Sequence, residues 1–182
     1  VLSPLPKVLS DTELDSALIT ASSYRRKAKP DSRPYALLFL LLNTGLKKNE
    51  CLGLHLNHIH LNEKDGPTIH VRYPSEANRY KERNIVLPPE FTDVFHEYVA
   101  QYQPTDNLFP WSPRRLEYIL EDISNDSRIG KHISFDMCRW TYALNLFRSG
   151  VESDTIRQNL GVSKIQWREL SNKIAKLASD AA

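Results

Sequence analysis

The sequence predicts an α+β domain that is mostly α-helical, with helices around a small three-stranded antiparallel sheet. Apolar residues recur at helical spacing up to about residue 53 and again after Pro89. Between Leu54 and Leu87 they fall instead into short segments separated by turns, which is typical of strands. A length of 182 residues fits one domain with a substantial core, and the interspersed charges are typical of a folded chain.

Two helices are expected before the sheet. The segment Ser10-Asp11-Thr12-Glu13 is a capping box, whose serine and glutamate side chains satisfy free backbone N–H groups, so a helix begins there and runs to about Arg26. A second helix runs from about Pro34 to Asn43 and ends at Gly45. Because this helix is apolar on nearly all sides, we expect it at the centre of the fold.

The expected strands lie around residues 54–61, 69–71 and 85–87, and Asp65-Gly66-Pro67 forms the turn between the first two. Helical spacing then returns in five segments, which begin near residues 89, 113, 135, 153 and 163. Because the chain begins at Val1 without a methionine, we expect residues 1–182 to be one domain excised from the C-terminal part of a longer protein.

The composition restricts the class of protein only loosely. A net charge of +2 is weak support for a nucleic-acid partner. Local basic patches are more informative, although a charge run is often only a solvated face. They lie at residues 24–27, at residues 79–83, and at Arg114-Arg115 beside Trp111.

Cysteine usage and hydropathy predict an intracellular protein. Cys51 and Cys138 fall in expected helices without metal-type spacing, which indicates reduced core residues. The longest apolar run, residues 36–42, is too short to span a bilayer, so we expect an intracellular, cytoplasmic protein with no membrane partner.

Four histidines in the sheet region suggest a metal site at first sight. In a strand, His58 and His60 would share one face while His55 would point the other way, and His70 lies on another segment. No cysteine or carboxylate joins them at ligand spacing. We therefore expect no metal and no cofactor.

Three segments, in order along the chain, carry a more specific pattern. They are Thr44-Gly45-Leu46-Lys47-Lys48-Asn49-Glu50, then Lys81-Glu82-Arg83-Asn84-Ile85-Val86-Leu87, then Arg139-Trp140-Thr141-Tyr142-Ala143 with the later Leu160-Gly161. They resemble the T-G-L-R-x-x-E, K-x-R-x-V-P-L and H-x-x-R-H-T-F-A…L-G-H patterns of the tyrosine recombinases, or phage integrases. The resemblance covers almost the whole chain. It implies that family's catalytic-domain fold, a DNA partner and a role in DNA recombination or integration.

The resemblance also implies a chemistry. In that family two arginines hold the scissile phosphate, a hairpin lysine protonates the leaving 5′ oxygen, two histidines (or a histidine and a tryptophan) assist, and a tyrosine attacks phosphorus. Guanidinium forks fit the spread negative charge of the transition state in geometry as well as sign. The tyrosine forms a covalent bond that conserves the energy for religation.

Most of these catalytic positions are substituted in this chain. The first arginine position holds Lys47, a point charge without the planar fork, and the second holds Arg139. The histidine three residues before the second arginine is Asp136, and the histidine of the L-G-H motif is Val162. The tyrosine position, nine residues further, is Ser171, and no tyrosine follows residue 142. We therefore expect impaired chemistry.

The resemblance also suggests which residues contact DNA. The hairpin-lysine position falls near Asn78 or Arg79, and Lys81 could reach over from its neighbouring position. Glu50 is expected to support the local fold, and Asp136 is placed to pair with Arg139 at i, i+3. The expected DNA contacts are Lys47, Arg79, Lys81, Arg83, Arg114, Arg115 and Arg139.

Three hypotheses stay open at this point. The first is a recombinase-like DNA-binding domain with weakened or absent chemistry, which a DNA-clamping N-terminal domain and self-association on DNA would accompany. The second is a working recombinase with an altered residue set, using Ser171 or a supplied nucleophile. The third is a helical protein-interaction module that keeps the fold without DNA chemistry, which the near-neutral charge slightly favours.

Overall fold

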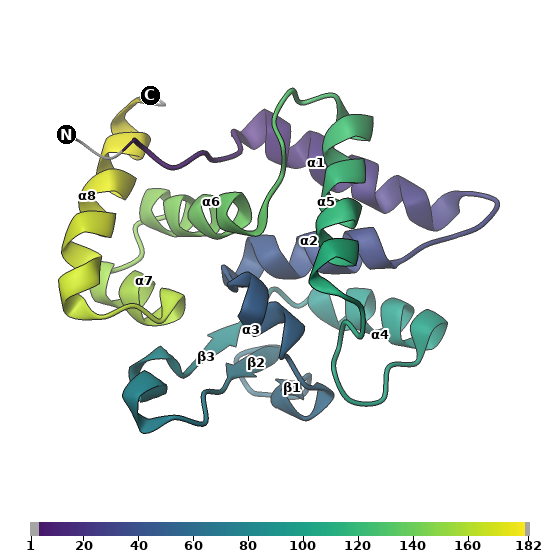
Figure 1. The fold of residues 1–182 in the computed structure, drawn as a ribbon, viewed down its shortest axis with the longest axis horizontal. Helices are drawn as coiled ribbons and strands as arrows, with labels where there is room; N and C mark the ends of the chain where they lie inside the picture. Colours follow the sequence, from purple (N-terminus) through teal and green to yellow (C-terminus); the bar gives the residue numbers. More distant parts are fainter. Residues whose placement is uncertain (1–3, 181–182) are drawn as a thin grey trace.

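The computed structural model describes residues 4–180 and shows helices packed above a small sheet (Figure 1). The helices are α1 (Asp11–Ser23), α2 (Arg33–Thr44), α3 (Lys48–Leu52), α4 (Phe91–Tyr102), α5 (Pro113–Ser127), α6 (Phe135–Arg148), α7 (Ser153–Leu160) and α8 (Lys164–Asp180). Short 3-10 turns lie at Tyr24–Arg26 (η1), Leu56–His58 (η2) and Glu76–Lys81 (η3). The predicted α+β class is confirmed.

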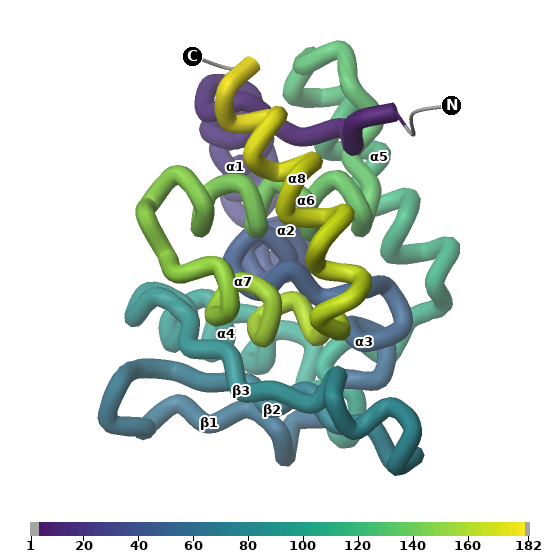
Figure 2. The backbone as a smooth tube through the Cα atoms, turned by 90° about the vertical axis from the view of Figure 1, so that its left-hand side faces the viewer, coloured from purple at the N-terminus to yellow at the C-terminus, as the bar shows by residue number. Residues whose placement is uncertain are grey.

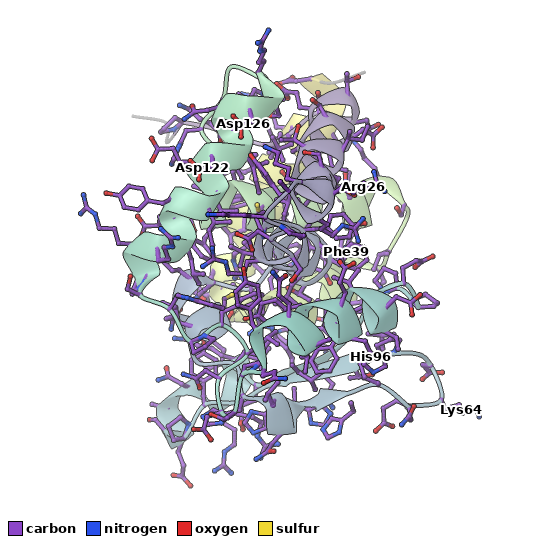
Figure 3. All side chains as sticks on the ribbon, turned by 90° about the vertical axis from the view of Figure 1, so that its right-hand side faces the viewer. Arg26, Phe39, Lys64, His96, Asp122 and Asp126 are labelled. Carbon is purple, nitrogen blue, oxygen red and sulfur yellow. The ribbon has the colours of Figure 1, made fainter. Side chains whose placement is uncertain are left out.

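The sheet has the strand order β1-β2-β3, and both pairs are antiparallel, as the sequence predicts. Its strands are β1 (Ile59–His60), β2 (Thr68–Val71) and β3 (Arg83–Val86). Figure 2 shows the sheet at the end of the molecule opposite α1. In the side view of Figure 3, Lys64 marks the β1–β2 turn at the outer edge, and His96 lies on α4, between the sheet and the other helices.

The helix α2 is the centre of the larger core, as its apolar sequence predicts. Leu37, Leu38, Leu40 and Leu41 are completely buried, because α1, α4, α5 and α6 all pack around them. Phe39, labelled in Figure 3, lies between the upper helices and α4, and its ring stacks near that of Phe91. Burying each such side chain contributes about 2 kcal/mol, so this helix fixes the positions of its neighbours.

A second, smaller core joins the C-terminal half of α6 to α7 and α8. Leu144, Ile156, Leu160 and Ile174 form its centre, and Val8 of the N-terminal segment packs against it. The N-terminal segment therefore crosses beside the C-terminal end of α8 (Figures 1 and 2).

The first strand is much shorter than the predicted segment of residues 54–61. The Leu56 N–H donates to the Asp106 carbonyl at 2.9 Å, and the Leu54 carbonyl accepts from the Leu108 N–H at 2.8 Å. The backbone of this segment is therefore paired with the α4–α5 connection, and only Ile59 and His60 are left to pair with β2. The capping box at Ser10 and Glu13 is confirmed, with hydrogen bonds of 3.2 and 2.8 Å.

Gly45 ends α2 and sets the direction in which the chain enters α3. Its φ of +65° lies in the left-handed region, and a Cβ at this position would stand 2.5 Å from Cδ2 of Tyr142 on α6. Only glycine meets both conditions, so the T-G-L motif is explained by backbone geometry and close helix packing.

We predict that Gly45→Ala destabilises the protein by at least about 2 kcal/mol, because it adds a steric clash to left-handed strain. Gly150→Ala is the matched control, since Gly150 also has a positive φ (+80°) but no atom within 4 Å of the place that a Cβ would take. The control should lose only about 1 kcal/mol. Urea unfolding followed by circular dichroism measures both, and equal losses would contradict the packing argument.

Candidate nucleic-acid interface

Glu50 and Arg83 form a buried ion pair at the junction of α3, β3 and α7. The two guanidinium Nη atoms of Arg83 donate to the two Glu50 carboxylate oxygens at 2.7 and 2.9 Å. Both side chains are at most 4% exposed. The Arg83 Nε also donates to the Asn159 carbonyl at the end of α7, at 2.7 Å. One guanidinium therefore joins three elements that are distant in the sequence.

The Glu50 carboxylate has a full set of hydrogen bonds. It also accepts from the Lys47 backbone N–H at 2.9 Å and from the Tyr73 hydroxyl. Burial by itself would raise the pKa of Glu50, but the Arg83 hydrogen bonds and charge, with the Tyr73 and Lys47 bonds, outweigh burial and lower it to about 2. Glu50 is therefore ionised at neutral pH, and the expectation that it supports the local fold is confirmed.

The buried position of Arg83 corrects its predicted role as a DNA contact. The sequence shows only a cation in a basic patch, whereas the structure places its guanidinium against Glu50 and two backbone carbonyls. Gly161 allows this close approach, because a Cβ there would stand 2.6 Å from Arg83 Nη1. Arg83 is a structural residue, and a phosphate could reach it only after the ion pair had separated.

Arg139 on α6 makes a second connection to the end of α7. Its Nη1 donates to the Gly45 carbonyl at 2.8 Å and its Nη2 to the Leu160 carbonyl at 2.7 Å. Burial, followed by the charge of Arg83, lowers the pKa of Arg139 to about 10, so the group stays cationic at neutral pH. Because two of its five N–H groups bind carbonyls, three are left for a ligand.

Lys47 lies at the N-cap of α3, two residues after the carbonyl that Arg139 holds. Burial and the nearby charge of Arg139 lower the pKa of Lys47, and the charges of Lys81 and Arg83 add to this effect. Lys81 lies at the end of η3, with its Nζ 5.5 Å from the ring centroid of Tyr73. Lys47, Lys81, Arg83 and Arg139, here called the cationic cluster, therefore come together from three separate segments, since Lys81 and Arg83 are two residues apart.

Asp136 lies near this cluster but makes no ion pair with Arg139 among residues 4–180, which corrects the predicted i, i+3 pair. Asp136 is exposed on the first turn of α6. Its charge raises the pKa of Arg139, but by less than burial and the charge of Arg83 lower it. It lines a surface hollow of about 250 Å³ together with Lys48 and His132. Arg139 points instead toward the backbone carbonyls that it binds.

Val162 and Ser171 occupy the histidine and tyrosine positions of the resemblance. Val162 is 6% exposed and belongs to the smaller core. Ser171 lies in the middle of α8, where its Oγ donates to the Arg168 carbonyl at 3.1 Å. Tyr142 is also buried, and its hydroxyl accepts a bond from Asn159.

The other predicted DNA contacts are exposed. Arg79 lies on η3, and Arg114 and Arg115 lie on the first turn of α5. The guanidinium of Arg114 stacks over the Tyr118 ring at 5.4 Å, which holds it on the surface. An ion pair of 3.1 Å between Lys48 and Glu117 places this end of α5 beside α3 and the cationic cluster.

Tyr73 is the residue that sequence reasoning missed. It binds Glu50 with its hydroxyl, and its ring lies under Lys81. Its position before Pro74, in a polar loop, gives no sign of this role in the sequence. Among residues 4–180, no group of three or more histidine, cysteine, aspartate or glutamate side chains is arranged to hold a metal ion, and no helix is long and apolar enough to cross a membrane.

Comparison with known proteins identifies the family. The family model described as "Phage integrase family" matches residues 7–168. The chain belongs to the phage integrase family. Phage integrase chains similar to this one include tyrosine recombinase XerC of Lacticaseibacillus casei, 24% identical over 179 residues that cover 91% of this chain and 57% of the relative. Tyrosine recombinase XerD of Halalkalibacterium halodurans is 25% identical over 185 residues, covering 94% of this chain and 58% of the relative.

Solved structures show the same integrase fold. XerA recombinase superposes with a TM-score of 0.77 at 21% identity, covering 99% of this chain and 66% of that one. XerH recombinase bound to a palindromic difH substrate superposes with a TM-score of 0.78 at 20% identity, covering 98% of this chain and 53% of that one. This phage integrase chain therefore spans somewhat more than half the length of the relatives that it matches.

We predict that removing one partner of the buried pair costs about 3–5 kcal/mol of unfolding free energy, because the other charge is left buried alone. Arg83→Met should show this loss, whereas the double variant Glu50→Leu with Arg83→Met should recover much of it. Urea unfolding of the single and double variants measures the difference. A double variant as unstable as the single one would contradict this interpretation of the pair.

The same pair makes stability depend on pH in a definite window. Because the folded-state pKa of Glu50 is about 2, below its ordinary 4.5, its contribution is complete above about pH 4.5 and is lost as the pH falls toward 2. Glu50→Gln should therefore lower stability at neutral pH and flatten the acid limb of the profile, which urea unfolding at a series of pH values measures.

Proposed function

We propose that this chain is the DNA-binding catalytic-type domain of an integrase-like protein, which holds duplex DNA by its phosphates and does not cleave it through a phosphotyrosine bond. The observation that carries the proposal is the cationic cluster. Four cations converge there, and only Arg83 is neutralised by a paired carboxylate. Among residues 4–180, Lys47, Lys81 and Arg139 have no paired carboxylate, so their positive charge is left to attract a phosphate.

The physical chemistry of this cluster suits a phosphate more than a neutral ligand. The charges of Arg139 and Lys81 lower the pKa of Lys47, because like charges repel one another. A bound anion would relieve that repulsion. Exposed Arg79, Arg114 and Arg115 extend the positive charge to either side along the surface. This arrangement supports contacts to several phosphates of one duplex, which position a protein on DNA without reading its sequence.

Complexes formed by some structural neighbours support DNA as the partner. XerH recombinase is described in complex with its difH substrate before and after cleavage, and a Tn1549 transposon integrase is described in complex with transposon right end DNA. A clamping domain before this chain, self-association on DNA and a nucleoid location are further predictions that accompany the proposal.

The chemistry of cleavage is where this chain departs from the expected pattern. Losing one preorganised donor of the transition state typically costs about 3 kcal/mol, or roughly a hundredfold or more in rate. Here the fork of one arginine is replaced by Lys47, and Val162 and Ser171 stand at the histidine and tyrosine positions. The Ser171 hydroxyl donates to a helix carbonyl, and a serine without an adjacent base is a poor nucleophile.

We predict salt-dependent binding of duplex DNA that depends on the cationic cluster. Lys47→Ala and Lys81→Ala should each weaken binding and reduce the slope of log K against log salt by about 1, because each removes one phosphate contact. Lys29→Ala is the control, since Lys29 is an exposed lysine of the α1–α2 connection, at the opposite end of α2 from Gly45. Fluorescence anisotropy with a labelled duplex measures all three.

Asp136→Asn should act in the opposite direction. It removes an exposed negative charge near the cluster, so affinity should rise by roughly fivefold at low salt and by less at high salt. Asp93→Asn, an exposed carboxylate on α4, should leave affinity unchanged. If Lys47→Ala, Lys81→Ala and Asp136→Asn all left the affinity for DNA unchanged, the alternative of a protein-interaction module would be favoured.

We further predict that nicked suicide substrates trap no covalent protein–DNA adduct. The assay is denaturing electrophoresis of the protein after incubation with labelled DNA, with a tyrosine recombinase such as XerD as the positive control. An adduct that disappears on Ser171→Ala or on Tyr142→Phe would show instead a working enzyme with an altered residue set.

A further inference from the structure

Four of the six histidines gather at one edge of the small sheet. The ring centroids of His60 and His70 lie 4.5 Å apart, and those of His55 and His58 lie 5.9 Å apart. The register explains the first contact, because His60 pairs with Thr68 and so shares a face of the sheet with His70.

The position of His55 corrects the alternation expected from a strand. Residues 56–58 form the 3-10 turn η2, so the two-residue period does not apply, and His55 lies against His58 and not on the opposite face. All four imidazoles therefore belong to one surface, here called the histidine edge (His55, His58, His60 and His70).

A small cavity lies between the histidine edge and α3. Its volume is about 190 Å³, and its lining includes four side chains that can donate hydrogen bonds, namely Asn49, His58, His70 and Arg72. The Arg72 side chain is 61% exposed, and its only ion-pair partner among residues 4–180 is Glu82, at 3.4 Å. A phosphate oxygen could therefore approach several donors here.

The cavity lies next to the cationic cluster. Glu50 and Tyr73 line it, and Glu50 binds Arg83 while the Tyr73 ring lies beside Lys81. Asn49 is the second residue of α3, which begins directly after Lys47. A DNA strand with one phosphate at the cationic cluster would thus carry a neighbouring phosphate toward the histidine edge.

We propose that the histidine edge, with Arg72, is a second contact for the DNA backbone, and that His58 and His70 take up protons when a phosphate binds. This inference rests on the proposed DNA-binding function. It adds to that function a binding subsite and a dependence of affinity on pH.

The charges around the edge explain the direction of this dependence. Burial, then the neighbouring histidines and Arg72, lower the pKa of His58 and of His70, so both are mostly neutral in the free protein at neutral pH. Few carboxylates counteract this lowering of the two histidine pKa values. Glu63 raises the pKa of His70, whereas Glu82 pairs with Arg72 and Glu50 is already bound to Arg83. A DNA phosphate supplies the missing negative charge, so protons are taken up on binding and affinity rises as the pH falls.

The test is the dissociation constant of a labelled duplex at constant ionic strength, measured between about pH 6 and about pH 8, the range in which histidine titrates. The wild-type chain should bind about tenfold more tightly at the acid end, because an average uptake of about half a proton for each duplex bound, over about two pH units, changes the affinity by one order of magnitude. His58→Asn with His70→Asn should lose most of this dependence, because the two imidazoles that take up the proton are gone. His96→Asn, on α4, is the matched control and should keep the full dependence.

Each outcome decides the proposal. Equal affinity of the wild-type chain across this range, or a dependence that survives in the double variant, would overturn the histidine edge and leave the proposed DNA binding intact. No binding at any pH would overturn both. Single variants His58→Asn and His70→Asn, checked by circular dichroism for native helix content, keep the test valid if the double variant unfolds, and each should then lose part of the dependence.

Discussion

The buried Glu50–Arg83 ion pair is the interaction on which the rest of the functional surface depends. Taking two charges out of water costs several kcal/mol for each ion, and only a complete set of hydrogen bonds makes such a pair tolerable. Glu50 has that set from Arg83, Tyr73 and the Lys47 backbone. The pair therefore holds α3, the η3–β3 hairpin and the end of α7 in one relative position, and Lys47 and Lys81 owe their convergence to it.

Arg139 strengthens the same junction. Its two hydrogen bonds to Gly45 and Leu160 connect α6 to the start of α3 and the end of α7. The first arginine position is occupied by Lys47, whose ammonium cannot hold a phosphate in a planar, bidentate way. Under the proposed function, this cluster docks a phosphate but lacks the preorganised geometry that speeds phosphoryl transfer.

Local signals in the sequence predicted much of the fold. The capping box at Ser10, the glycine stop at Gly45 and the apolar sequence of α2 depend on neighbours within a few residues, and the structure agrees with each. The first strand is shorter than predicted, because the backbone at Leu54 and Leu56 pairs with a segment about fifty residues away. No periodicity within one segment reports such a partner.

The candidate site was harder to predict for the same reason. Arg83 appears in the sequence as one of several cations in a basic patch, and only its distant partner Glu50 makes it a buried structural residue. Residue type and order along the chain identified the family, whereas the role of each cation was decided by contacts between segments.

The most direct test of phosphate binding at the cationic cluster is a crystal structure of the chain with a short duplex. We expect a backbone phosphate within hydrogen-bond distance of Lys47 Nζ and of a free Arg139 N–H, with the Glu50–Arg83 pair intact. A duplex bound on another face, with no phosphate near Lys47, Lys81 or Arg139, would contradict this expectation.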